Sequence, residues 1–149
     1  MNTLEPCHLD IIGDGDSRGA FLHLLAEYNI NYTYHGLVFE EDRKKDILSH
    51  CHYGLNTFKD TACVGLTMKS LDYMAYDLPI INTIHGDTER IVEEENIGFN
   101  LNDINKTAHD ISSCSDTQYL NMKKNVIAVH EKYFSIDVFQ QKLENILPK

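Results

Sequence analysis

The chain alternates between short apolar runs and longer segments in which apolar residues recur every three or four positions. Short runs are typical of buried strands, and the longer spacing is typical of helices that pack on a core. We expect strands at residues 8–13, 30–36, 53–58, 79–84 and 98–102, with a helix after each of the first four and three more helices at residues 103–114, 116–134 and 136–147. This order predicts an α/β fold with a mainly parallel sheet covered on both faces.

Two of the predicted helices have a defined apolar face. In the helix at residues 16–29 this face consists of Phe21, Leu24, Leu25 and Tyr28. In the helix that begins within residues 64–70, the apolar face consists of Leu71, Met74, Ala75 and Leu78. We expect both faces to lie in the core, because side chains at this spacing share one side of a helix.

Composition narrows the class of protein. The chain has 149 residues, 42% of them hydrophobic and 24% charged, which indicates one ordinary globular domain. Its formal net charge of -10 argues against a protein that binds nucleic-acid backbones. No apolar run approaches the roughly 20 residues of a membrane span, and the N-terminus lacks the features of a signal peptide. The four cysteines are widely spaced, so we expect reduced thiols and a cytoplasmic location.

Ligands of parallel α/β sheets bind beyond the carboxyl ends of the strands, where the N-termini of the helices point. The loops at residues 13–17, 36–39, 59–67 and 86–88 have this position. In the first loop, Gly13 and Gly15 allow a tight turn, but the stretch IIGDGDSR does not contain GxGxxG. It is either a plain turn with Asp16 as the helix N-cap or a loop that touches a sugar or an acceptor.

The helix that follows the third strand carries the main candidate site. Gly65 permits close approach of a ligand, and the free N–H groups of the first helical turn favour anions. Lys69 adds a positive charge, and Asp72 is placed to accept hydrogen bonds from vicinal hydroxyls such as those of ribose. The alternative is that Lys69 and Asp72 form a surface ion pair at spacing i,i+3.

Three other candidates are weaker. The stretch SHCHYG, residues 49–54, ends a helix and enters a strand, so its side chains diverge and we expect no metal site there. We expect His50 or His52 to interact with the C-terminus of the helix. His85 is either a base or phosphate contact or a plain surface histidine, and Cys63 lies near a helix start without a recognisable partner histidine.

Several motifs resemble those of one enzyme family. The segment at residues 68–98, MKSLDYMAYDLPIINTIHGDTERIVEEENIG, is similar to the K-x-x-E-Y-M-A-x-G-x-P-I-I region of retaining glycosyltransferases with the GT-B architecture, group 1 and family 4-like. IIGDGDSR resembles the G-D-G turn of this family, and YHGLVFEEDRKK resembles its H-G-x-V segment. The resemblance covers residues 9–100, and its motifs occur in the family's order.

This resemblance implies a binding site for a nucleotide-sugar donor, in which Gly36, Leu37 and Val38 lie against the base. Gly65, Leu66 and Thr67 would face the diphosphate from the N-terminus of a helix, Lys69 would neutralise phosphate, and Asp72 would bind the ribose. The chain also departs from the family pattern. Asp72 stands where the family has glutamate, Val64 replaces the glutamate that contacts the sugar, and Asp77 replaces a glycine.

The resemblance also implies the architecture and the partners. We expect residues 1–149 to be a single donor-binding domain, a three-layer Rossmann-like sandwich that forms the C-terminal half of a GT-B enzyme. It would lack its first βα unit and the N-terminal acceptor domain. The whole enzyme would move a sugar from a donor, such as a UDP-sugar, to a glycan, lipid-linked or protein acceptor, as in polysaccharide biosynthesis.

Further expectations follow from the same family. The site would need no cofactor and no metal, and the chain would need an N-terminal acceptor domain or a partner chain for activity. It would bind no nucleic acid and would meet a membrane at most peripherally, through the full enzyme. The alternatives are a non-catalytic α/β interaction module, a degenerate subunit of a split glycosyltransferase, or a fragment of a Rossmann dehydrogenase or epimerase. The missing GxGxxG counts against the last of these.

Overall fold

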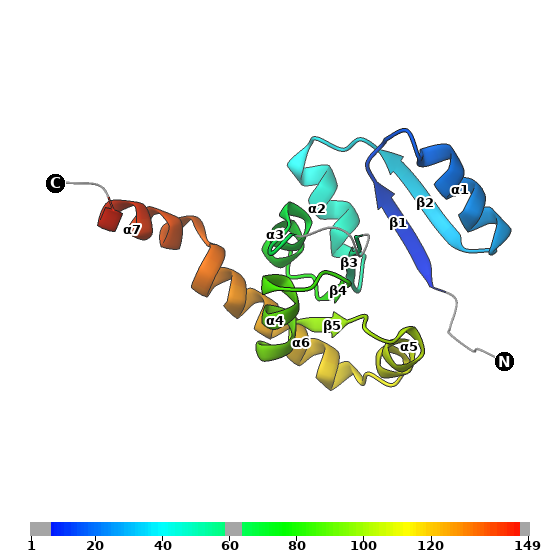
Figure 1. Ribbon diagram of the computed structural model, residues 1–149. Helices are drawn as coiled ribbons and strands as arrows, with labels where there is room; N and C mark the ends of the chain where they lie inside the picture. Colours follow the sequence, from blue (N-terminus) through cyan, green and yellow to red (C-terminus); the bar gives the residue numbers. More distant parts are fainter. Residues whose placement is uncertain (1–6, 59–63, 147–149) are drawn as a thin grey trace. The chain divides into compact units, whose positions relative to one another are not determined.

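The computed structural model describes residues 7–58 and 64–146 (Figure 1). Its elements follow one another in the order β1 (His8–Ile12), α1 (Arg18–Glu27), β2 (Asn31–Gly36), α2 (Glu41–Ser49), β3 (Gly54–Asn56), α3 (Met68–Ala75), β4 (Ile80–Asn82), α4 (Asp87–Glu94), β5 (Gly98–Asn100), α5 (Ile104–Ser112), α6 (Asp116–Val129), the π-helical segment η1 (His130–Phe134) and α7 (Ile136–Ile146). The predicted alternation of strands and helices, followed by helices alone, is confirmed.

The chain divides into two compact units, and unit 2 begins at His52. Unit 1 contains β1 and β2, which pair in parallel, and a bulge between Ile11 and Ile12 shifts their register. Gly13 follows β1 and Gly36 ends β2, both have positive φ, and the Gly13 N–H donates to the Gly36 carbonyl over 2.8 Å. This bond ties together the two loops that leave β1 and β2.

Unit 2 contains a parallel sheet in the order β3-β4-β5. The register aligns the three strands residue by residue, so that Gly54, Ile80 and Gly98 are neighbours, as are Asn56, Asn82 and Asn100. Since side chains alternate along a strand, these six residues share one face of the sheet. Gly54 lies directly under the ring of Tyr73 from α3, which leaves no room for a side chain at that position.

The core of unit 2 lies on the face of the sheet that carries Ile80. Its buried residues come from α3, β4, α4, the position just before β5, and α6: they are Met74, Ile80, Val92, Ile97, Val126 and Val129. Helices α3, α4 and α6 therefore cover this face. Phe134 of η1 packs against the same cluster, so the π-helical turn also has a place in the core.

The predicted apolar faces of the helices are only partly buried. In α1, Leu25 is buried, whereas Phe21, Leu24 and Tyr28 are 43%, 48% and 68% exposed. In the segment that contains α3, Met74 and Leu78 are buried as expected, but Ala75 is exposed. Among the described residues, none of the helices combines the length and apolar character that a membrane crossing requires.

The start of α1 differs from expectation, because Ser17 rather than Asp16 precedes the helix, and the Ser17 side chain makes no cap hydrogen bond. Gly86, with φ +106, occupies the N-cap position of α4. After α4, Asn96 has a left-handed φ of 50, and Gly98 begins β5. Gly86 and Asn96 thus supply the positive φ that the tight connections before and after α4 need.

Candidate functional site

The N-terminus of α3 is held by a capping box. The Thr67 hydroxyl accepts a hydrogen bond from the Ser70 N–H over 3.0 Å, and the Thr67 N–H donates to the Ser70 hydroxyl over 3.1 Å. Both residues are buried. The first turn of α3 therefore has a fixed start, which leaves its remaining N–H groups directed beyond the carboxyl end of β3.

A row of three asparagine side chains lies across the carboxyl ends of β3, β4 and β5. Asn56 Nδ2 donates to Asn82 Oδ1, and Asn82 Nδ2 donates to Asn100 Oδ1, both over 3.0 Å. Asn56 and Asn82 are 0% and 1% exposed. We call these three residues the asparagine row.

The asparagine row continues into the loops at both of its ends. The Thr67 hydroxyl donates to Asn56 Oδ1 over 2.8 Å, and Asn100 Nδ2 donates to the Glu89 carbonyl over 3.0 Å. In the middle, the Ile84 N–H donates to Asn82 Oδ1, and Asn82 Nδ2 donates to the Ile84 carbonyl. The row thus links the start of α3, the loop after β4 and the first turn of α4.

The loops before α3 and α4 are also joined directly. The main-chain N–H and the hydroxyl of Thr88 both donate to the Gly65 carbonyl, over 2.9 and 2.7 Å. A Cβ added at Gly86 would lie 3.9 Å from the Gly65 Cα, and one added at Gly65 would lie 2.9 Å from Asp87 Oδ2. Two glycine loops and two helix N-termini therefore adjoin, with the Asp87 carboxylate beside Gly65.

Lys69 is exposed in the first turn of α3, and its ammonium lies 4.5 Å from the centre of the Phe58 ring. The N–H of Phe58, which follows β3, donates to the Thr83 hydroxyl after β4 over 3.0 Å. A cation over an aromatic face is attracted by the ring quadrupole. Phe58 therefore helps to keep the charge of Lys69 at the carboxyl end of β3.

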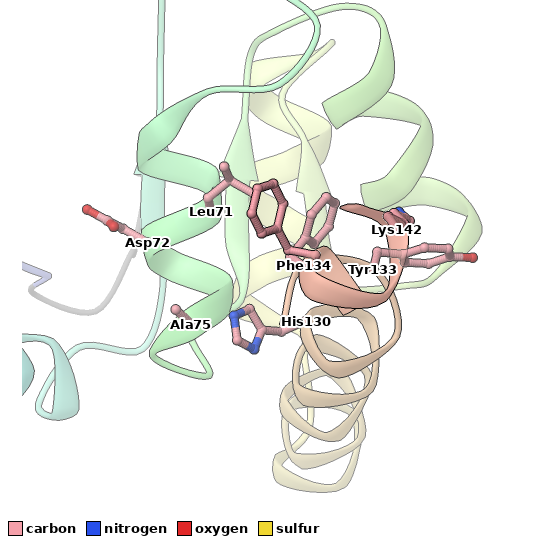
Figure 2. Close-up of a pocket in the computed structure, with 8 residues that line it drawn as sticks. Leu71, Asp72, Ala75, His130, Tyr133, Phe134 and Lys142 are labelled. Carbon is pink, nitrogen blue, oxygen red and sulfur yellow. The ribbon is translucent and has the colours of Figure 1, made fainter. Parts of the chain in front are cut away.

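Asp72 is half-buried on the next turn of α3. It borders a pocket of about 310 Å³ between α3, η1 and α7, whose other lining residues are Leu71, Ala75, His130, Tyr133, Phe134, Phe139 and Lys142. Figure 2 shows Leu71 directed toward the aromatic side chains of this pocket, whereas the Asp72 carboxylate points away from them. The carboxylate therefore belongs to a different side of α3 from the pocket.

The other predicted donor-binding residues fall into two groups. Leu66 packs against the core of unit 2, and the buried Thr67 uses its hydroxyl within the capping box and the asparagine row. Gly36, Leu37 and Val38 belong to unit 1, where they end β2 and begin the next loop, and Leu37 is 55% exposed. The donor-binding roles of all eight predicted residues stay predictions.

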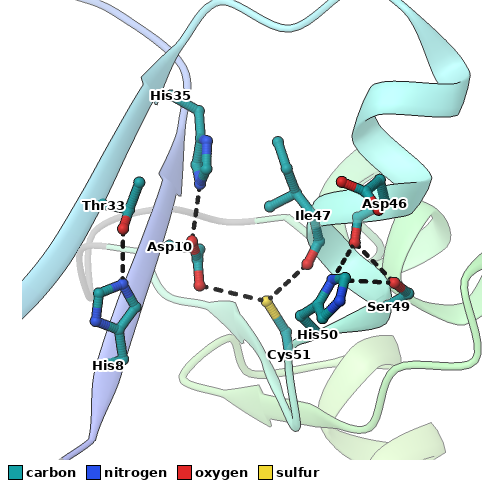
Figure 3. Close-up of polar contacts among 9 residues, drawn as sticks. All are labelled: His8, Asp10, Thr33, His35, Asp46, Ile47, Ser49, His50 and Cys51. Carbon is teal, nitrogen blue, oxygen red and sulfur yellow. Dashed lines mark hydrogen bonds and ion pairs between the residues drawn. The ribbon is translucent and has the colours of Figure 1, made fainter.

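Unit 1 has a polar cluster around Asp10 (Figure 3). His35 Nε2 lies 2.8 Å from Asp10 Oδ1, and the Cys51 sulfur lies 3.9 Å from Asp10 Oδ2 and 3.4 Å from the Ile47 carbonyl, which share its single S–H donor. Burial and the Asp10 carboxylate raise the pKa of the Cys51 thiol. A raised pKa disfavours the thiolate, so this cysteine is a weak nucleophile.

The remaining sequence candidates have simple environments. His50 is the C-cap of α2, and its Nδ1 lies 2.8 Å from the Asp46 carbonyl, as expected for a histidine at a helix C-terminus. Cys63 lies outside the described residues. Within residues 7–58 and 64–146, no group of three His, Cys, Asp or Glu side chains is arranged to hold a metal ion.

His85 is exposed just before α4, and its Nδ1 lies 3.1 Å from Glu89 Oε2. The same carboxylate oxygen accepts a longer hydrogen bond from the Gly86 N–H. These two partners lower the pKa of Glu89, the His85 contact being the larger cause. The contact with the Glu89 side chain thus holds His85 beside the first turn of α4.

Sequence reasoning missed the asparagine row, Phe58 and Thr88. A signal for the row was present, because the strands that became β3, β4 and β5 read GLN, IIN and GFN and each ends in asparagine. Asparagine is uncommon in strands, so its recurrence at three strand ends indicates a shared role. Phe58 and Thr88 gave no such signal, because each acts through a contact with a distant part of the chain.

The parallel sheets, the helix order and the loops at the carboxyl ends of the strands define a Rossmann-like α/β protein. The profile of the family described as "Glucosyltransferase 3-like, C-terminal domain" matches residues 23–145. This chain belongs to that family. The expectation of a glycosyltransferase C-terminal domain with an α/β, Rossmann-like fold is therefore confirmed.

Two solved structures illustrate this fold. The crystal structure of Anabaena Alr3699/HepE in complex with UDP superposes with a TM-score of 0.67 at 19% identity, over 92% of this chain and 40% of that one. AviGT4, a glycosyltransferase involved in avilamycin A biosynthesis, gives a TM-score of 0.52 at 16% identity, over 93% of this chain and 43% of that one. This chain thus spans less than half the length of either protein. A search of curated proteins returned no match.

Proposed function

We propose that this chain is the donor-binding domain of a glycosyltransferase and binds a nucleotide sugar through its diphosphate. The observation that carries the proposal is the junction at Gly65, where the N-termini of α3 and α4 adjoin and Thr88 ties their loops together. Oriented N–H groups and a nearby lysine are suited to a diphosphate leaving group, which gains negative charge during sugar transfer. Membership of the family and the UDP bound by HepE support this reading.

Individual residues receive roles within this proposal. Lys69, held over Phe58, would neutralise part of the diphosphate charge. Asp72 would accept hydrogen bonds from the ribose, and the main chain of Gly65, Leu66 and Thr67 would face the phosphates. Gly36, Leu37 and Val38 would lie against the base. We take the donor to be a UDP-sugar and the acceptor to be a glycan, a lipid-linked sugar or a protein.

One observation favours the alternative of a non-catalytic module. The Asp87 carboxylate lies beside Gly65, where a diphosphate would approach. Its negative charge would repel the negative charge of the diphosphate. Val64 also replaces the glutamate that the resemblance predicts for the sugar contact. In this alternative, the junction at Gly65 would be a structural link between two loops and would bind no anion.

Titrations with UDP, GDP and uridine, monitored by NMR chemical shifts, distinguish a donor-binding domain from a non-catalytic module. The proposal predicts that UDP shifts the signals of residues 65–72 and 36–38. UDP should bind more weakly to Lys69→Ala and Asp72→Ala. Its affinity should change little in the controls Lys124→Ala and Asp137→Ala. Lys69→Ala should affect UDP more than uridine, because its partner is the diphosphate. Absence of shifts with every nucleotide in the folded wild type would favour the non-catalytic module.

Activity of the whole protein is a further proposal. Sugar transfer needs the acceptor to be placed against the donor, and such positioning carries a large share of catalysis. We therefore propose that this domain acts together with an acceptor-binding domain or partner chain. A cytoplasmic location accords with the free thiols of Cys7, Cys51 and Cys114, and fractionation of cells that produce the protein would test it.

A further inference from the structure

We infer that the asparagine row is a positioning element for the proposed diphosphate site, and that it sets the N-terminal loops of α3 and α4 relative to each other. This inference rests on the proposed function for its ligand. The partners of the row lie at both sides of the junction at Gly65: Thr67 is in the loop before α3, Ile84 is in the loop before α4, and Glu89 is in the first turn of α4. The row itself would touch no substrate.

The hydrogen bonds of the row all run in one direction. The Thr67 hydroxyl accepts from the Ser70 N–H and donates its proton to Asn56 Oδ1. At the other end, the Glu89 carbonyl only accepts, so the nitrogen of Asn100 must face it. The main-chain groups therefore fix every amide in between, and no side chain of the row can turn over without placing like groups together.

The asparagine row is a costly way to fill the space between strand ends. Buried amides contribute little net stability even when all their partners are present, and each lost partner leaves an unsatisfied polar group. Apolar side chains of similar volume would need no partners of their own, but they would leave the Thr67 hydroxyl and the Ile84 N–H and carbonyl without theirs. They would also not supply a directed connection from Thr67 to Glu89.

The test uses Asn100→Ala, which removes the bond to Glu89 at the half-buried end of the row, with Asn82→Ala as the stronger variant. Asn125→Ala is the matched control, because Asn125 Nδ2 also donates to a main-chain carbonyl, that of Asn96, outside the row. Hydrogen exchange of main-chain amides reports on the loops without any ligand. NMR titrations with UDP and with uridine report on the diphosphate separately from the nucleoside.

We expect faster exchange at residues 65–67 and 84–89 in Asn100→Ala, with the amides of α6 unchanged. We also expect the preference for UDP over uridine to fall by roughly three- to tenfold, the effect of about one hydrogen bond. The control Asn125→Ala should change neither the exchange rates of these residues nor the preference for UDP over uridine. Uniformly faster exchange, or equal weakening of UDP and uridine, would overturn the inference and leave the row a structural feature only.

The two proposals fail in different ways. If wild type binds no nucleotide, the proposed function fails, and the exchange pattern still decides whether the row sets the two loops. If wild type binds UDP and Asn100→Ala keeps the full preference over uridine, the positioning role is wrong and the donor site stands. If Asn82→Ala does not fold, Asn100→Ala decides alone, because its side chain is less buried than that of Asn82.

Discussion

Thr88 donates both its main-chain N–H and its hydroxyl to the same carbonyl oxygen, that of Gly65. The two residues are 23 positions apart, and the pair of bonds fastens the start of α4 to the loop before α3. Thr88 is 2% exposed, so water does not replace a missing partner easily. This relationship makes the junction at Gly65 a fixed part of unit 2.

Thr88→Val should therefore destabilise the protein by about 1 kcal/mol, because it removes one of the two bonds and keeps the shape of the side chain. Urea unfolding, followed by circular dichroism, measures the effect. The control is Thr117→Val on the exposed start of α6, where we expect a much smaller change. Equal effects of the two substitutions would show that the second bond to Gly65 contributes nothing.

Two glycines of unit 2 should respond differently to alanine. At Gly54 a Cβ would enter the ring of Tyr73, which packs against the core, so Gly54→Ala should destabilise by about 1–3 kcal/mol or more. At Gly65 the obstacle is the end of the Asp87 side chain, which turns away easily, so Gly65→Ala should have less than half that effect. Thermal unfolding of both variants makes the comparison. A larger loss in Gly65→Ala would contradict it.

Glu89 should contribute to stability in a pH-dependent way. The pKa of its carboxyl is lowered from the ordinary 4.5, chiefly by His85, so the charged form is stabilised in the folded state. Its contribution is then fully present above pH 4.5 and is lost as the pH falls through the lowered value. Glu89→Gln should therefore be less stable than wild type at pH 7.

The Glu89→Gln experiment needs a second pH and a control. Once the pH falls below the lowered pKa of Glu89, the difference from wild type should shrink toward zero, because the carboxyl is then protonated in both the folded and the unfolded state. Glu144→Gln in the exposed helix α7 should show little difference at either pH. A deficit in Glu89→Gln that is the same at both pH values would mean that the charge of Glu89 is irrelevant.

Cys51 should react slowly with iodoacetamide at pH 8, and more slowly than the exposed Cys7. Burial and Asp10 raise its thiol pKa, which leaves little of the reactive thiolate. Asp10→Asn should accelerate the reaction of Cys51 by roughly three- to tenfold, because it removes the nearby negative charge. Peptide-resolved mass spectrometry measures each cysteine separately.

The control for Asp10→Asn is Asp14→Asn. Asp14 is an exposed carboxylate of the same unit that pairs with Arg18, so its loss should leave Cys51 unaffected. Acceleration by both substitutions would point to a general loosening of unit 1 rather than to the contact between Asp10 and the thiol.

Sequence periodicity predicted most of the elements, because the apolar spacing of strands and helices survives in a single chain. The order of all five strands and the burial of Met74 and Leu78 follow from it. It failed where exposure depends on what packs nearby, as at Phe21 and Ala75. It also did not show that the helix at residues 116–134 passes into a π-helical turn at His130.

The sequence predicted which residue types belong to the candidate site, but it did not predict the contacts that hold them in place. Gly65, Lys69 and Asp72 stood out as residue types suited to a nucleotide, and the helix start beside them formed as expected. The contacts that fix the site join residues far apart in the chain, such as Phe58 with Lys69, Asn56 with Asn82, and Thr88 with Gly65. Single-sequence spacing carries no information about such pairs.

All hydrogen bonds of the asparagine row run in one direction, and this constrains how the sequence of the domain can change during evolution. Replacement of one asparagine removes a hydrogen-bond partner from each asparagine on an adjoining strand, so each single step is destabilising before the next can compensate. Exchange of the row for apolar residues needs three coordinated changes. Descendants of this domain should therefore keep all three asparagines or lose them together, and a lineage that retains only one or two should be rare.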